Sequence, residues 1–186
     1  MSFTIRAACA VEWQVLKHLR ISALIEAPDA FGPTAEAALR FDDAYWQRFA
    51  AYFDSRWRHM FIAISDSSGE HAADSLTPTG HVAETDHAAG LISAVRERDG
   101  TGHLGAFWVA PHTRGTGLGA HLFDAALSWL ERDLRCPRVE LSVTEGNEQA
   151  EAMYGRRGFA RSGRFEPLRE GSPLRNVYMS KVVPRA

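Results

Sequence analysis

The chain has 186 residues, of which 45% are hydrophobic and 24% are charged, with a formal net charge of -2. This composition predicts a single globular domain over residues 1–186 and excludes the basic field of a nucleic-acid-binding protein. No apolar run is long enough to predict a membrane span, and the first residues, M-S-F-T-I-R, lack the features of a signal peptide. The sequence therefore predicts a cytoplasmic protein without membrane contact.

The first third of the chain predicts a strand followed by two helices. Apolar and polar residues alternate over residues 3–7, which is typical of a strand, whereas residues 11–25 carry apolar side chains at helical spacing. Two prolines and a glycine predict a loop over residues 27–34. Thr34 is a potential N-cap for a second helix that runs to Phe53.

Two further strands are predicted over residues 59–65 and 88–97. Residues 66–87 between them are polar or small and show no period, which predicts a flexible hairpin insertion. This segment has no H-x-x-x-H or paired-cysteine spacing, so we predict no metal site and interpret its polar residues as solvated loop positions. The residues that could suggest a metal are His71, Asp74, His81, Glu84, Asp86 and His87.

A glycine-rich turn follows the next predicted strand. Residues 104–109 are apolar or small, and Pro111 ends the strand because it cannot donate to a sheet ladder. Gly115, Gly117 and Gly119 come next, and apolar residues at helical spacing begin at Leu118. A plain tight turn would explain the glycines alone, but a helix start also presents unpaired N–H groups and a positive dipole end. The turn therefore predicts a phosphate site, with Arg114 at its edge.

The spacing of the glycines limits which phosphate compound is expected. A nucleoside-triphosphate loop requires G-x-x-x-x-G-K-[ST], and a dinucleotide turn requires G-x-G-x-x-G. The glycines here run G-x-G-x-G, and no Lys-Ser or Lys-Thr pair follows them. Both common nucleotide sites are therefore disfavoured.

The last part of the chain predicts a strand, a helix and two more strands. Val139, Leu141 and Val143 share one face of a strand over residues 138–144. Asn147 can cap a helix that ends before Gly158, and strands are predicted from Phe159 and over residues 176–182.

Several of these patterns occur together in one known family. The motif R-x-x-G-x-G at Arg114, Gly117 and Gly119 follows a V-x-P segment and precedes N-x-x-A-x-x-x-Y, which begins at Asn147 and ends at Tyr154. In this combination the chain resembles the GNAT superfamily of acetyl-CoA-dependent N-acetyltransferases. The resemblance extends from near the N-terminus to Lys181 and is strongest between residues 104 and 159.

The resemblance implies a fold and a cofactor. The implied fold is a single α/β domain with a mixed, largely antiparallel sheet, helices on both faces, and two central strands that splay apart. The implied activity is transfer of an acetyl group from acetyl-CoA to a small-molecule or peptide amine, in a protein that can form a homodimer. The cofactor-binding positions that it implies are Trp108, Val109, Arg114, Gly115, Thr116, Gly117, Leu118, Gly119 and Asn147.

The resemblance also implies roles for individual side chains and amides. The amides of Val109 and Trp108 would polarise the thioester carbonyl, and the Tyr154 hydroxyl would protonate the departing thiolate. A core aromatic is the alternative role for Tyr154, and simple helix capping is the alternative for Asn147. Phe31 would line the acceptor pocket, although a buried loop anchor fits it equally well.

The general base is less well indicated. The family often places Glu at the position of His103, and a histidine titrates near neutral pH. An ordinary surface histidine is the alternative, and Glu84 or a chain of waters could serve instead. A catalytically inactive acyl-CoA-binding sensor or interaction module is the alternative function for the whole chain. The sequence does not identify the acceptor amine.

Overall fold

The structure is a computed structural model that describes residues 2–66 and 87–184. Most of the predicted insertion at residues 66–87 therefore lies outside the described residues, as do all of its potential metal ligands except His87. Glu84, an alternative candidate for the base, lies outside them as well.

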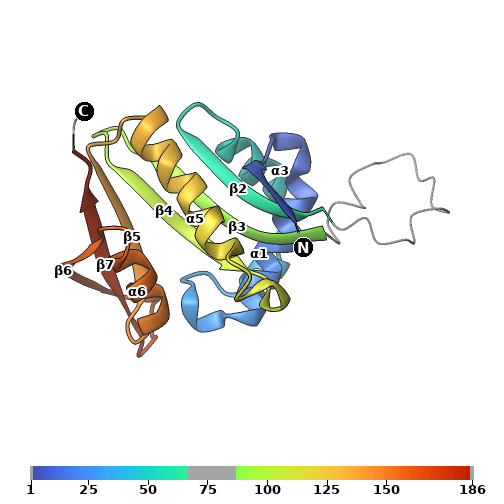
Figure 1. The fold of residues 1–186 in the computed structure, drawn as a ribbon. Coiled ribbons are helices and arrows are strands. Elements are labelled where there is room, and N and C mark those ends of the chain that lie inside the picture. The colour runs from blue at the N-terminus through green and yellow to red at the C-terminus, as the bar shows by residue number, and fades with distance from the viewer. Residues whose placement is uncertain (1, 67–86, 185–186) are drawn as a thin grey trace.

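The described residues form one seven-stranded sheet in the order β1-β2-β3-β4-β5-β7-β6 (Figure 1). Neighbouring strands are antiparallel except for the central pair β4 and β5, which is parallel. This arrangement confirms the predicted mixed, largely antiparallel α/β fold. The strands are β1 (Phe3–Ala7), β2 (Arg58–Ser65), β3 (Ala88–Arg96), β4 (Gly102–Val109), β5 (Arg138–Thr144), β6 (Ala160–Pro167) and β7 (Arg175–Val182).

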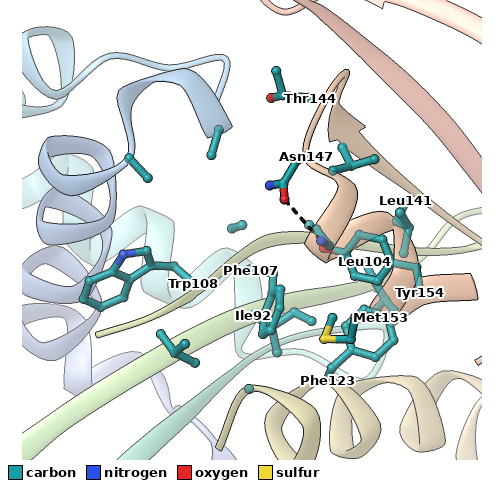
Figure 2. Close-up of a pocket in the computed structure, with 18 of the residues that line it drawn as sticks. Ile92, Leu104, Phe107, Trp108, Phe123, Leu141, Thr144, Asn147, Met153 and Tyr154 are labelled. Carbon is teal, nitrogen blue, oxygen red and sulfur yellow. Dashed lines mark hydrogen bonds between the residues drawn. The ribbon is translucent and has the colours of Figure 1, made fainter. Parts of the chain in front are cut away.

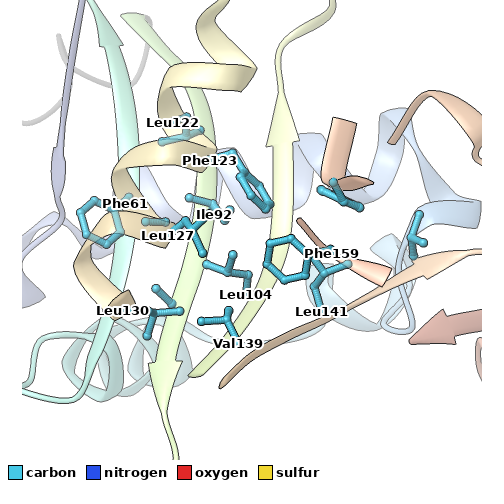
Figure 3. Close-up of a cluster of buried hydrophobic side chains, with 14 of the residues drawn as sticks. Phe61, Ile92, Leu104, Leu122, Phe123, Leu127, Leu130, Val139, Leu141 and Phe159 are labelled. Atoms are coloured by element: carbon cyan, nitrogen blue, oxygen red, sulfur yellow. The ribbon is translucent and has the colours of Figure 1, made fainter. Parts of the chain in front are cut away.

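Helices cover both faces of the sheet (Figure 1). One buried cluster packs α5 against β2, β3, β4 and β5, with Phe123, Leu127 and Leu130 at its centre (Figure 3). A second cluster lies under α1 and α3 on the opposite face and includes Trp46 and Trp108. The helices are α1 (Trp13–Glu26), α2 (Ala35–Leu39), α3 (Asp43–Phe53), α5 (Leu118–Ser128) and α6 (Glu148–Gly155), with short 3-10 turns at Ala10–Glu12, Pro28–Ala30 and Pro111–Thr113 and a π-helical turn at Trp129–Asp133.

The predicted helix from Thr34 to Phe53 is two helices. Thr34 caps α2 by accepting a hydrogen bond from the N–H of Ala37 at 3.2 Å, as expected. Asp42 caps α3 in the same way, accepting from the N–H of Tyr45 at 2.8 Å. An extended backbone at a second N-cap residue interrupts the helical path, so one amphipathic pattern covers two separate segments.

The central strands β4 and β5 separate along their length, as the resemblance implied. They pair at three positions, from Gly102 with Val139 to Leu104 with Leu141. Beyond Leu104, β4 continues to Val109 beside β3 alone, while β5 continues beside β7. The separation leaves one edge of each strand without a strand partner, and the candidate site lies there.

Candidate active site

A cavity of about 870 Å³ opens where β4 and β5 separate (Figure 2). One wall consists of the C-terminal half of β4 and the turn that starts α5. The facing wall consists of β5 and α6, and the end of α1 with the loop after it closes a third side. Segments from both halves of the sequence therefore meet around one space.

The glycine-rich turn lies at the start of α5, on the rim of this cavity. Gly117 is the N-cap residue and has φ of +89°, and Gly115 has φ of +80° with open space where a side chain would be. A Cβ at Gly119 would lie 3.4 Å from Cζ of Phe107, so this position holds the helix close to β4. The first-turn N–H groups of Gly119 and Ala120 have no intrahelical acceptor. The turn therefore has the geometry of an anion site.

Thr116 and Leu118 support the turn and do not belong to the cavity lining. The Thr116 hydroxyl donates to the carbonyl of Thr113 at 2.7 Å and accepts from the N–H of Leu118 at 3.4 Å. The Leu118 side chain is buried in the α5 cluster. A contact between these two residues and a ligand would therefore involve their backbone.

Arg114 is joined to the end of α1. Its guanidinium donates to Glu26 at 2.6 and 3.1 Å and to the carbonyl of Val109 at 3.3 Å. Trp108 also donates its indole N–H to Glu26, at 3.0 Å. Hydrogen bonding to Arg114 holds the pKa of the Glu26 carboxyl below its usual range. Glu26 is therefore a carboxylate at neutral pH.

The end of β4 presents alternating amides to the cavity. The N–H of Ala110 donates to β3 at 2.8 Å, and backbone groups two residues apart in a strand point the same way. The Trp108 N–H therefore faces β3, whereas the N–H and carbonyl of Val109 face the separation. The hydrogen bond from Arg114 to the Val109 carbonyl agrees with this orientation.

A β-bulge changes the course of β4 just before Trp108 and Val109. The register with β3 shifts so that Ala106 and Phe107 oppose the single residue Ile92, and Ala106 has φ of +50°. Such a conformation is strained for a residue with a Cβ and typically marks a functional position. By the same alternation, the Phe107 N–H also faces the separation.

Tyr154 lies on α6 at the wall opposite β4 (Figure 2). Its side chain is 6% exposed and packs against Phe123 and Phe159, with ring centroids 5.1 and 6.4 Å apart. Among the described residues, no protein group forms a hydrogen bond with its hydroxyl. Burial raises the pKa of Tyr154 to about 12, so the phenol is protonated at neutral pH.

Asn147 lines the same cavity (Figure 2). Its side-chain oxygen accepts from the N–H of Ala150 at 3.2 Å and so caps α6. The side-chain NH₂ group of Asn147 takes no part in this hydrogen bond. Capping, the alternative role considered from the sequence, is therefore compatible with contact to a ligand.

The far end of the cavity is closed by contacts between the two halves of the molecule. Phe31, predicted to line the acceptor pocket, is 8% exposed and belongs to the cavity lining. Arg169 donates to the carbonyls of Pro28 and Phe31 at 2.9 and 3.0 Å. The Thr144 hydroxyl donates to the carbonyl of Asp29 at 2.7 Å. The loop after α1 is thus fixed to both β5 and the loop between β6 and β7.

The structure does not bring His103 to this cavity. His103 lies where β4 is still paired on both sides, opposite Val95 of β3 and Glu140 of β5. The lining residues of β4 begin at Leu104 and continue toward Val109. The catalytic role considered for His103 therefore gains no support from its position.

Sequence reasoning missed Glu26, Arg20 and Phe107. Glu26 and Arg20 are α1 residues that line the cavity, and nothing in their local sequence distinguishes them from surface residues of an amphipathic helix. The one available signal was an acidic residue at a helix C-terminus, where the dipole disfavours it.

Comparisons with known proteins agree with this architecture. A family model described as the acetyltransferase (GNAT) family matches residues 38–159. The chain is 36% identical over 93 residues to a peptidyl-lysine N-acetyltransferase, YjaB, of Escherichia coli, covering 46% of this chain and 59% of that protein. It is 40% identical over 70 residues to a mycothiol acetyltransferase of Salinispora tropica, covering 36% of this chain and 23% of that protein. Each match thus spans only part of the relative.

Solved structures show the same fold at low identity. An acetyltransferase of the GNAT family from Streptococcus pneumoniae superposes with a TM-score of 0.72 at 17% identity, covering 98% of this chain and all (100%) of that one. A spermidine N-acetyltransferase from Vibrio cholerae in complex with CoA and spermine superposes with a TM-score of 0.70 at 14% identity, covering 97% and 95% of the two chains. Within residues 2–66 and 87–184, no helix combines the length and apolarity of a membrane span, and no cluster of His, Cys, Asp and Glu suits a metal ion.

Proposed function

The chain belongs to the acetyltransferase (GNAT) family, and we propose that it transfers an acetyl group from acetyl-CoA to a primary amine by direct attack. One observation carries this proposal. The anion-binding turn of α5, the outward amide of Val109 and the Tyr154 hydroxyl all adjoin a single cavity between β4 and β5. The names of the relatives, which include lysine and mycothiol acetyltransferases, support an amine acceptor.

The turn at the start of α5 fits the pyrophosphate of CoA. The positive φ values of Gly115 and Gly117 and the open space at Gly115 let phosphate oxygens approach the backbone N–H groups. Arg114 adds a positive charge on the same rim. The separation of β4 and β5 leaves an edge of unpaired backbone groups that suits the amides of pantetheine.

Backbone amides of β4 supply the polarising donors. The N–H groups of Val109 and Phe107 face the separation, where the thioester would lie, and Phe107 is an addition to the amides expected from the sequence. Preorganised N–H donors stabilise negative charge that develops on a carbonyl oxygen, and removing one such donor costs about 10² to 10³ in rate. The Trp108 N–H faces β3 and is not directed at the thioester. Trp108 therefore contributes through its side chain, whose indole N–H donates to Glu26.

Tyr154 stabilises the leaving sulfur. A pKa of about 12 keeps its hydroxyl protonated, whereas an ordinary thiol has a pKa of about 8.5. Complete proton transfer from this phenol to a thiolate is therefore uphill. Donation of a hydrogen bond to the sulfur as charge develops is the contribution that we assign to Tyr154.

The amine proton leaves to water in this proposal. Among the described lining residues, the only carboxylate is Glu26. Its lowered pKa and its ion pair with Arg114 make it a weak base. The reaction rate should then rise with pH as the free acceptor amine loses its proton.

Release of CoA thiol from acetyl-CoA in the presence of a panel of amines tests this function. Amine-dependent thiol release, with formation of the acetylated amine, is the expected result. Cofactor binding without turnover across a broad panel would instead support the inactive acyl-CoA-binding module.

A further inference from the structure

Arg20 of α1 lines the cavity beside Phe31. It is a half-buried lining residue, and its guanidinium carbon lies 4.8 Å from the centroid of the Phe31 ring. Its position at the Phe31 end of the cavity associates it with the acceptor and not with the cofactor phosphates.

No carboxylate among the described residues pairs with this guanidinium. Its Nη1 atom is buried and has no hydrogen-bond partner. The acidic groups on the adjacent segments are already engaged, since Glu26 binds Arg114 and Trp108, and Asp29 lies 3.6 Å from Arg169. Burial lowers the pKa of the guanidinium.

A half-buried cation without a counter-charge is energetically unfavourable. Stacking on an aromatic ring such as Phe31 offsets this cost by only about 0.5–2 kcal/mol. The planar guanidinium fork is well suited to a carboxylate, which it binds through two parallel hydrogen bonds. A ligand carboxylate at the accessible side of the guanidinium would therefore supply the missing counter-charge of Arg20.

The charge balance at this end of the cavity indicates a monoanion. Arg169 directs one Nη to backbone carbonyls and the other toward Asp29. Arg20 is then the one half-buried cation without a partner among the described residues that line the cavity. Arg156, which follows α6, also lines the cavity without a partner among the described residues, but it is exposed. A single half-buried cation matches one carboxylate better than a phosphate dianion.

We propose that the acceptor carries a carboxylate that Arg20 binds, so that the substrates are amino acids or similar compounds with both an amine and a carboxylate. This inference rests on the proposed acetyl transfer and narrows its substrate class. Arg20 is a specificity-determining residue in this account and takes no part in the bond changes.

Matched acceptors test the proposal. Each L-amino acid is compared with its carboxamide and with its decarboxylated amine, at saturating acetyl-CoA, by thiol release. The wild-type protein should show a kcat/KM about 10 to 100-fold higher for the acids, because hydrogen bonds to charged groups contribute about 1.5–3 kcal/mol. Arg20→Gln should lose this preference by lowering kcat/KM for the acids alone. Arg20→Lys should retain part of it.

The control variant is Arg40→Gln, since Arg40 directly after α2 is exposed, pairs with Glu36 and lies outside the cavity lining. It should leave the preference for acids unchanged. Equal rates for acids and carboxamides in the wild type would overturn the proposal. An equal loss for both in Arg20→Gln would also overturn it, because that pattern indicates a structural role.

Binding measurements separate this inference from the proposed function. Calorimetric affinity for acetyl-CoA should be the same in Arg20→Gln and the wild type; a weakened affinity would assign Arg20 to the cofactor phosphates and overturn the inference. If acetyl-CoA binds but no amine is acetylated, the proposed function fails. The carboxylate site is then tested by measuring the binding of the amino acids to the protein in the presence of CoA. Binding that is lost in Arg20→Gln supports the site, whereas absence of binding to the wild-type protein refutes it.

Discussion

Glu26 and Arg114, 88 residues apart in the sequence, form an ion pair with a distance of 2.6 Å between Nη2 and the carboxylate. The pair joins the last residue of α1 to the rim of the turn that starts α5. Arg114 also occupies the carbonyl of Val109, one of the backbone groups that face the strand separation. The positive charge of Arg114 is thus directed toward the end of α1.

The ion pair predicts an unusual effect of Glu26→Gln on cofactor affinity. If Arg114 must leave Glu26 to reach the phosphates, weakening the pair favours binding. The two side chains are 48% and 32% exposed, and such pairs contribute at most about 1 kcal/mol. We therefore expect acetyl-CoA to bind up to about 5-fold more tightly to Glu26→Gln, as measured by calorimetry.

Two further variants provide comparisons for the affinity of Glu26→Gln. Glu36→Gln removes an exposed carboxylate from α2, paired with Arg40, and should not change the affinity. Arg114→Gln should weaken binding. Weaker binding to Glu26→Gln would instead show that Glu26 holds Arg114 in its cofactor-binding position.

Gly117→Val should abolish the thermal stabilisation of the protein by acetyl-CoA. The side chain would occupy the space that phosphate oxygens need near the amides, and stabilisation by a ligand depends directly on its affinity. Because Gly117 has φ of +89°, the substitution also strains the backbone.

Gly163→Val controls for that strain. Gly163 in β6 has φ of +82° and open surroundings, and it lies outside the cavity lining. This variant should lose intrinsic stability to a similar extent while keeping the shift in melting temperature on adding acetyl-CoA. If acetyl-CoA shifts the melting temperature of Gly117→Val as much as that of the wild type, the turn is not part of the binding site.

The parts of the fold that the sequence predicts are those with local causes. The turn of α5 could be predicted because glycine spacing and a helix start are adjacent in the chain, and the Asn147 cap follows from the same kind of signal. Hydrophobic alternation placed the strands correctly for a similar reason. The break at Asp42 was missed because the apolar period continues across it.

Features that depend on distant residues could not be predicted from the sequence. The bulge at Ala106 arises from the register between β4 and β3, and the pairing of Glu26 with Arg114 arises from the packing of α1 beside β4. The candidate base His103 followed from counting along β4, whereas the position where β4 leaves β5 determines which of its residues reach the cavity. The sequence of a single strand or helix likewise does not predict which distant charged residue will pair with it.

Glu12 should make the protein sensitive to acid. Its carboxylate is almost fully buried and accepts from Arg6 at 2.6 and 2.8 Å and from the N–H of Cys9 at 2.8 Å. Burial alone would raise the pKa of Glu12, but these hydrogen bonds lower it from 4.5 to about 2. A lowered pKa in the folded state contributes stability above the unfolded pKa, and this contribution disappears as pH falls from about 4.5 toward 2.

Urea unfolding at pH 6 and pH 2.5 measures this contribution. We expect Glu12 to account for up to about 3 kcal/mol of the loss in wild-type stability between these pH values. Glu12→Gln should be less stable at pH 6 and should lose less on acidification. Equal pH dependence of the two proteins would contradict the assignment.

Tyr154→Phe separates a role in chemistry from a role in packing. The substitution keeps the ring in contact with Phe123 and Phe159 and removes only the hydroxyl, which has no protein partner among the described residues. If the hydroxyl donates to the leaving sulfur, the interaction exists mainly in the transition state, so kcat should fall while acetyl-CoA affinity is retained. A hydrogen bond to a charged group contributes about 1.5–3 kcal/mol, so we expect kcat to fall by about 10 to 100-fold. Tyr52→Phe is the matched control, because Tyr52 is an exposed residue of α3 outside the cavity lining, and it should change kcat by less than about 2-fold. A near-normal kcat for Tyr154→Phe, with altered thermal stability, would show that Tyr154 serves the core.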